Sequence, residues 1–238
     1  MFRSSLIGLV SSLALISVAN AADMYVPAAG GYKDGPVAYD WTGFYAGIQG
    51  GGAWGHSIQT FDAGSTARFD ISGGEGGGTL GYNRQIQQWV LGVEADFSGS
   101  QISGKTGSTA TYGCGTICST NVSSFGTLRG RLGYAWNNLL FYGTGGLAYG
   151  NIESNLSGGT ATNWQTGWTA GAGVEYAFTH NWSAKLEWEH VTFDSFQWTN
   201  ATNVHYTCTG IDCSTDAKFN VIRAGLNYHL GNEYAPLK

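Results

Sequence analysis

Two segments of the chain alternate large apolar residues with small or charged ones at a period of two. Between Trp89 and Phe97 the odd-numbered positions are apolar, whereas Glu94 and Asp96 lie on the other face. The segment 127–136 repeats the pattern, with leucine, tyrosine and tryptophan on one face and arginine and threonine on the other. A period of two indicates β-strands. The charges share their face with glycines, which suits a narrow interior, so the apolar face points outward as in a transmembrane β-barrel.

Eight segments show this alternation, and each is long enough for a tilted strand to cross a bilayer, which takes about 9–11 residues. The connections after the second, fourth and sixth segments are short, and the others are long. Short turns on one side and long loops on the other are typical of outer-membrane barrels, with the short turns in the periplasm. The sequence therefore predicts an all-β fold, an eight-stranded antiparallel up-and-down transmembrane β-barrel within residues 41–238. The predicted strands cover 42–54, 73–83, 89–97, 124–136, 139–152, 164–178, 182–193 and 218–230.

The composition agrees with this fold. Of the 238 residues, 11% are charged, 14% are aromatic and 38 are glycine. Few charges with many glycines and aromatics suit a barrel that has small residues in its lumen and aromatic residues on its outer wall. The net charge of −5 and the lack of a basic patch argue against nucleic acid as a partner.

The N-terminus has the features of a secretory signal peptide. Arg3 precedes an apolar run from Leu6 to Val18, and the small residues Ala-Asn-Ala follow at 19–21. We expect residues 1–21 to be removed, and the short run and the cleavage sequence disfavour the alternative of an N-terminal membrane helix. Residues 22–40 show no periodicity and are predicted to form a flexible periplasmic lead-in.

The four cysteines form two close pairs, Cys114 with Cys118 and Cys208 with Cys213, in polar stretches that we interpret as loops. Export takes the chain into an oxidising compartment, where disulfides form. We favour one local disulfide in each loop, and a bond between Cys114 and Cys208 stays open as an alternative. A zinc site that recruits His205 is disfavoured, because no second histidine and no CxxC spacing supports it.

The inward face of the predicted strands carries ten charged residues. Buried charges persist only when they are paired and hydrogen-bonded, so we expect ion pairs between neighbouring strands. An eight-stranded barrel is just wide enough for side chains to fill it. We therefore predict a packed polar plug, and the alternative is a narrow water or ion path gated by rearranged ion pairs. The residues of this charge network are Glu75, Glu94, Asp96, Arg129, Arg131, Glu175, Lys185, Glu187, Glu189 and Arg223.

Eight outward aromatic residues lie next to the short turns or at the end of the last strand. Tryptophan and tyrosine favour the membrane interface, because each combines an apolar body with a polar tip. We predict that these residues form a ring at one end of the barrel, instead of the core of a soluble protein. They are Tyr82, Trp89, Trp136, Phe141, Tyr176, Phe178, Trp182 and Tyr228.

Residues with catalytic potential are few. Asp194, His205, Asp212 and Asp216 could gather at the mouth of the loops, but no serine or cysteine stands at a recognisable triad spacing, and we interpret them as solvated loop residues. The glycine run 73–78 lacks the lysine and hydroxyl residue of a phosphate loop and is better explained as barrel wall. We therefore expect no catalytic residue, no cofactor and no metal site.

Several motifs along the chain resemble the small outer-membrane proteins of alphaproteobacteria, of the rhizobial and Brucella type. These opacity-like or porin-family proteins share an OmpA-like eight-stranded barrel. The resemblance implies residence in the outer membrane of a Gram-negative bacterium and a contribution to envelope integrity, and some members contact host surfaces or bind small ligands such as haem. No catalytic residues carry over. The matching stretches lie at 19–23, 39–47, 92–97, 127–135, 142–150 and 167–176.

Three functions remain open from the sequence. The first is a structural outer-membrane barrel that supports the envelope and makes contacts through its surface loops. The second is a small-solute channel of the porin type, and the third, less favoured, is a barrel enzyme that acts on lipid. We expect outer-membrane lipid and lipopolysaccharide as surroundings, with a host surface or a small molecule as a further contact of the loops. A closed barrel has no free edge, so we expect a monomer.

Overall fold

The computed structural model divides the chain into two compact units, residues 1–35 and 36–238. The residues it describes are 39–61, 64–65, 68–107, 117–156, 159–194, 196–197 and 214–230, and all of them belong to the second unit. The predicted signal peptide and all but the last two residues of the predicted lead-in lie outside this part. Among the described residues there is no helix long and apolar enough to cross a membrane.

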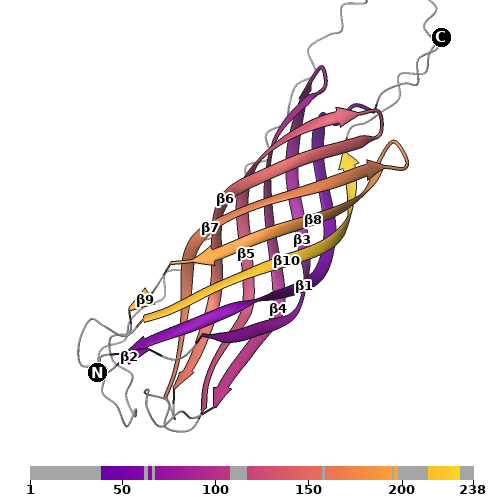
Figure 1. Cartoon of the computed structure of the whole chain (residues 1–238). Helices are drawn as coiled ribbons and strands as arrows, with labels where there is room; N and C mark the ends of the chain where they lie inside the picture. The colour runs from indigo at the N-terminus through magenta and orange to yellow at the C-terminus, as the bar shows by residue number, and fades with distance from the viewer. Residues whose placement is uncertain are drawn as a thin grey trace, which may run out of the picture. The chain divides into compact units, whose positions relative to one another are not determined.

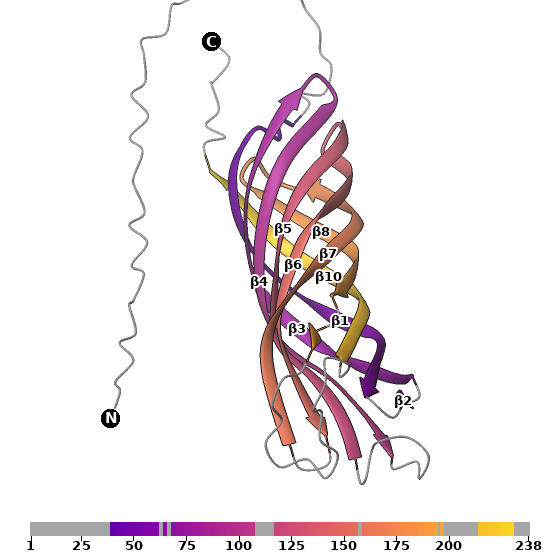
Figure 2. The same cartoon turned by 90° about the vertical axis from the view of Figure 1, so that its left-hand side faces the viewer.

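The second unit is a closed barrel of eight long antiparallel strands (Figures 1 and 2). Each strand pairs with the next along the chain, and β1 also pairs with β10, so the sheet closes on itself. Two short segments, β2 (Gly64–Ser65) and β9 (Phe196–Gln197), pair antiparallel with one end of β1 and of β10 respectively. The predicted fold is confirmed. The long strands are β1 (Gly43–Phe61), β3 (Phe69–Ile86), β4 (Trp89–Gly107), β5 (Ile117–Trp136), β6 (Leu139–Leu156), β7 (Gly159–Ala177), β8 (Trp182–Phe193) and β10 (Ser214–Leu230).

Short turns join the strands at one end of the barrel, which we call the short-turn end; the opposite end is the long-loop end. Gln87–Gln88 and Asn137–Asn138 are two-residue turns, and residues 178–181 join β7 to β8. Gln87 and Asn137 have φ values of 57° and 53°, which a tight hairpin requires of its first turn residue. Asn137–Asn138 is the turn that the sequence predicts, whereas β3 continues to Ile86 instead of 83, so the first turn is shorter than predicted.

The strands extend further toward the long-loop end than the sequence predicts. β5 begins at Ile117 instead of 124, and β7 at Gly159 instead of 164. These extensions are rich in serine, threonine and glycine, so they carry little apolar alternation. In β5 the register shifts between Val122 and Ser124. Even-numbered residues such as Val122 face inward before this shift, and odd-numbered residues such as Phe125 face inward after it. A strict period of two cannot continue through such a bulge.

Inward glycines let the barrel remain narrow. The ring of Tyr45 lies over Gly81, where a Cβ atom would stand 2.3 Å from the tyrosine Cζ atom. The ring of Tyr142 covers Gly173 in the same way, with a Cβ-to-Cζ distance of 2.5 Å. A large inward side chain on one strand thus occupies the place that glycine leaves on its neighbour. This packing explains the high glycine content better than flexibility does.

Candidate functional site

The barrel interior contains all ten side chains of the predicted charge network, and each of them is buried. They come from β3, β4, β5, β7, β8 and β10, so the network crosses the lumen instead of following one wall. Nine of the ten take part in ion pairs, and Glu75 does not. The structure therefore brings together nine of the predicted residues and leaves one apart.

Arg129 is the hub of the network. The β4–β5 register places it directly opposite Glu94, and its Nη2 atom lies 2.5 Å from that carboxylate and 3.1 Å from Asp96. Its Nη1 atom reaches across the lumen to Glu187 at 2.8 Å and to Glu189 at 3.6 Å. One planar guanidinium with several donors therefore links two opposite walls.

Arg223 joins the same acids from the other side. It lies opposite Glu187 in the β8–β10 register, and its Nε atom is 3.6 Å from that carboxylate. It also pairs with Glu189, and its Nη1 atom lies 3.3 Å from Asp96. Three carboxylates therefore form ion pairs with both Arg129 and Arg223, namely Asp96, Glu187 and Glu189.

A second group of charges lies nearer the short-turn end, around Glu175. This carboxylate pairs with Arg131 and accepts hydrogen bonds from Ser183 at 2.5 Å and from Asn227 at 2.7 Å. The Arg131 guanidinium also lies 3.7 Å from the ring centre of Tyr142. Tyr45 links the two groups, because its hydroxyl donates a hydrogen bond to Glu94 at 2.7 Å and accepts one from Arg131 at 3.3 Å. The Nζ atom of Lys185 lies 3.2 Å from Glu94.

An apolar layer fills the lumen on the long-loop side of the charge network. Phe125 and Phe193 both pack against Phe219, with ring centres 5.5 and 5.9 Å apart, and Ile102 and Ile152 belong to the same buried cluster. The sequence prediction of a packed polar plug does not include this layer. Phe219 and Val221 stand at inward positions of the predicted last strand, so the alternation there already contained the signal.

A third layer closes the short-turn end. Trp41 is fully buried, and its ring lies 4.7 Å from that of Tyr39 and 5.7 Å from that of His229. The Tyr39 hydroxyl donates a hydrogen bond to the backbone oxygen of His180. The segment before β1 therefore folds back so that its side chains fill the opening of the barrel at the short-turn end. The last part of the predicted lead-in packs in this layer, and nothing in the sequence pattern distinguishes it from a free tail.

The eight predicted interface aromatics lie on the outer wall, Tyr82 half-buried and the others exposed. Tyr82 packs against Phe44 and Trp182 against Tyr228, with ring centres 4.8 and 5.1 Å apart. Trp89 contacts Tyr134 edge to face at 5.6 Å. Other aromatics such as Trp164 are exposed farther from the short turns, so aromatic residues are not confined to this end.

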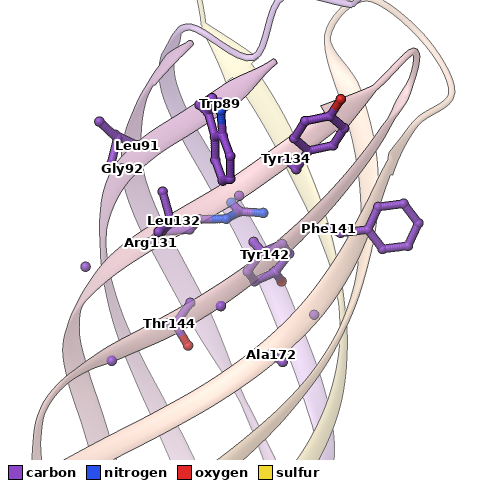
Figure 3. Close-up of a pocket in the computed structure, with 15 residues that line it drawn as sticks. Trp89, Leu91, Gly92, Arg131, Leu132, Tyr134, Phe141, Tyr142, Thr144 and Ala172 are labelled. Carbon is purple, nitrogen blue, oxygen red and sulfur yellow. The ribbon is translucent and has the colours of Figure 1, made fainter. Parts of the chain in front are cut away.

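A groove of about 960 Å³ lies on the outer wall over β4–β7 (Figure 3). Its lining includes Gly130, Gly143 and Ala172, and larger residues such as Trp89 and Phe141. Figure 3 also shows the two faces of the wall, with Phe141 turned away from Arg131 and Tyr142. The groove arises because these glycine and alanine residues have little or no side chain to fill the wall that faces lipid.

Ser183, His229 and Glu175 lie together near the short-turn end but do not form a catalytic triad. The Ser183 Oγ atom lies 3.0 Å from His229 Nε2 and donates directly to Glu175. A triad needs the acid on the other ring nitrogen of the histidine. Here the Nδ1 atom of His229 has no hydrogen-bond partner and Glu175 pairs with Arg131. The three residues form a structural hydrogen-bond cluster.

The remaining candidates lie at or beyond the loops. Cys118 is buried near the start of β5, whereas Cys114, Cys208 and Cys213 lie outside the described residues, so the disulfide pairing stays a prediction. Asp194 and Asp216 lie at strand ends, and His205 and Asp212 lie outside the described part. No group of three or more metal-binding side chains is found in the part of the chain that the structure describes.

Curated relatives of the chain are outer-membrane proteins of alphaproteobacteria. The "31 kDa outer-membrane immunogenic protein" of Brucella melitensis is 36% identical over 230 residues, which cover 88% of this chain and 92% of the relative. The "22 kDa outer membrane protein" of Rhizobium leguminosarum is 35% identical over 168 residues, 68% of this chain and 70% of the relative.

Among solved structures, Neisserial surface protein A aligns with 79% of this chain and 98% of its own, with 16% identity and a TM-score of 0.41. The family model described as "Outer membrane protein beta-barrel domain" matches residues 9–229. The curated relatives and the family model agree with the closed barrel on membrane and fold. The chain is an outer-membrane protein of a Gram-negative bacterium and belongs to the outer-membrane β-barrel family.

Proposed function

We propose that this protein is a structural barrel of the outer membrane whose lumen is sealed, and that it supports the envelope instead of conducting solutes. The observation that carries the proposal is the filling of the lumen at three levels. The Trp41 layer, the charge network and the Phe219 layer follow one another along the interior. An eight-stranded barrel has little room for a water path beside such side chains.

Single-channel recording tests this proposal. The protein is purified from outer membranes, and heat-modifiable gel migration verifies that it is folded before it is added to a planar bilayer. We expect no discrete conductance steps. A double variant, Phe193→Ala with Phe219→Ala, thins the apolar layer, and Leu147→Ala on the outer wall is its matched control. Stable steps from the unmodified protein would overturn the proposal and favour the small-solute channel.

We also propose that the barrel is not an enzyme. The support is that its one serine–histidine–glutamate cluster in the described part is buried and lacks triad geometry. Folded protein should hydrolyse neither phospholipid nor a peptide library above the level of a heat-unfolded sample. Hydrolysis that disappears in Asp194→Asn or His205→Asn protein would contradict this proposal and point to a site at the loop mouth.

The surface loops are proposed to make the contacts of this protein outside the cell. The Brucella relatives are named immunogenic proteins, which supports exposure of the corresponding loops here. A peptide tag placed within 108–116 should be labelled by antibody on intact cells, whereas a tag at Asn137–Asn138 should be labelled only after the outer membrane is opened. The reverse pattern would show that the barrel is inserted the other way round.

The barrel is proposed to act as a monomer. Pairing of β1 with β10 leaves no open edge to which a second chain must add. Native mass spectrometry from detergent should give the mass of one chain. A dimer that persists on dilution would contradict this proposal.

A further inference from the structure

Glu75 is the exception among the buried charges of the described lumen. It is only 8% exposed, and neither of its carboxylate oxygens has a hydrogen-bond partner. The other five acids of the network each have at least one cation within ion-pair distance. A buried carboxylate without a counter-charge is strongly unfavourable, and no side chain of the described barrel supplies one to Glu75.

The basic residue at the same level of the strand register as Glu75 is already engaged. Across the register Arg223 faces Gly51, and Gly51 faces Glu75. The guanidinium of Arg223, however, pairs with Asp96, Glu187 and Glu189. Six acids against four basic residues also leave the network with an excess of negative charge. All four basic residues of the network are therefore committed to other acids.

Two further oxygen-bearing side chains near Glu75 lack partners. Gln49 and Ser98 both face Gly77 from its two neighbouring strands, and Glu75 lies two residues before Gly77 on the same inward face. The amide oxygen and nitrogen of Gln49 and the hydroxyl of Ser98 are buried with no hydrogen-bond partner. Diagonal neighbours of this kind lie about 7–8 Å apart at their Cα atoms, within reach of long side chains.

We propose that Glu75, Gln49 and Ser98 form an internal site for a small monovalent cation such as Na⁺. The site offers carboxylate, amide and hydroxyl oxygens, which are the donors that hard cations prefer. Its single negative charge matches one positive charge. Gly77 carries no side chain between the donors, and the Ser98 Oγ atom lies 2.6 Å from the place that its Cβ atom would take. The ion supplies the counter-charge that Arg223 does not.

The test compares unfolding in different salts at constant ionic strength. The full protein is unfolded in urea and refolded into detergent micelles in sodium chloride or in N-methylglucamine chloride, so that no ion has to enter a sealed barrel. We expect the unfolding temperature to rise by about 3 °C for each tenfold increase in Na⁺ above its dissociation constant. The bulky organic cation should give no such rise.

Variants assign the effect to the site. Glu75→Gln removes the charge at nearly constant shape and should abolish the difference between the two salts. Glu153→Gln, which changes a carboxylate outside the network, is the matched control and should retain it. Gln49→Leu provides a second variant if the first fails to fold, and it should weaken the Na⁺ dependence. Equal unfolding temperatures of the unmodified protein in both salts would overturn the proposal, as would a salt difference that Glu75→Gln leaves unchanged.

Discussion

At the scale of single residues, Arg129 has the largest number of ion-pair partners in the described lumen. Replacing it by leucine leaves four buried carboxylates with less counter-charge. Removal of one partner of a buried ion pair costs about 3–5 kcal/mol. We expect the free energy of unfolding of Arg129→Leu to fall by that amount in urea titrations followed by tryptophan fluorescence.

Arg84→Leu is the control for this change, because Arg84 is exposed near the end of β3. Its free energy of unfolding should change by less than about 0.5 kcal/mol. Equal effects of the two substitutions would show that the network contributes nothing beyond the loss of one positive charge.

Adjacent glycines on β6 provide a second residue-scale prediction. A Cβ atom on Gly146 would lie 2.1 Å from the backbone oxygen of Leu128 and 2.7 Å from the Cα atom of Arg129. On Gly145 the nearest atom would be 3.8 Å away. Gly146→Ala must push β5 outward and should cost about 1–3 kcal/mol, whereas Gly145→Ala should be nearly neutral. Urea midpoints of the two variants, measured side by side, decide the matter; a neutral Gly146→Ala would refute the close approach of β5 and β6.

At the scale of the strands and turns, Gln87 begins the β3–β4 hairpin at a φ of 57°. The left-handed region destabilises residues other than glycine by about 1–2 kcal/mol. Glycine avoids this strain, but part of the gain is offset because glycine loses more conformational entropy on folding. We expect Gln87→Gly to stabilise the barrel by about 0.5–1 kcal/mol in thermal unfolding. Gln88→Gly should destabilise it, because Gln88 does not have a positive φ. The opposite order would mean that the turn changes its conformation on substitution.

The elements also show how far sequence reasoning reaches. The strand count, the short turns and the inward position of charges such as Arg129 and Glu187 follow from alternation, because a period of two assigns each residue a face. Alternation does not say which acid meets which base, since Lys185 faces Glu175 in the register and yet its Nζ atom contacts Glu94. The strand extensions and the burial of Trp41 depend on contacts across the lumen, which no local pattern records.

At the scale of the whole molecule, the three layers should seal the barrel independently. Trp41→Ala removes most of the layer at the short-turn end and should cost about 3–5 kcal/mol of stability, as truncation of buried tryptophan does. Conductance should nevertheless remain absent, because the charge network and the Phe219 layer stay in place. Planar-bilayer recording measures this outcome, with Trp164→Ala on the outer wall as control. Discrete steps in Trp41→Ala alone would identify the short-turn layer as the only seal.

The pairing of β1 with β10 also governs how the molecule is made. Phe44 pairs with Leu230, so β1 cannot complete its pairing until β10, the last of the long strands to be synthesised, is present. Contacts between such distant parts of a chain form slowly. Until the last strand arrives, an unfinished chain presents two open edges that can bind one another or a second molecule. A chain truncated before β10 should therefore be bound by periplasmic chaperones and cleaved by proteases more readily than the full chain.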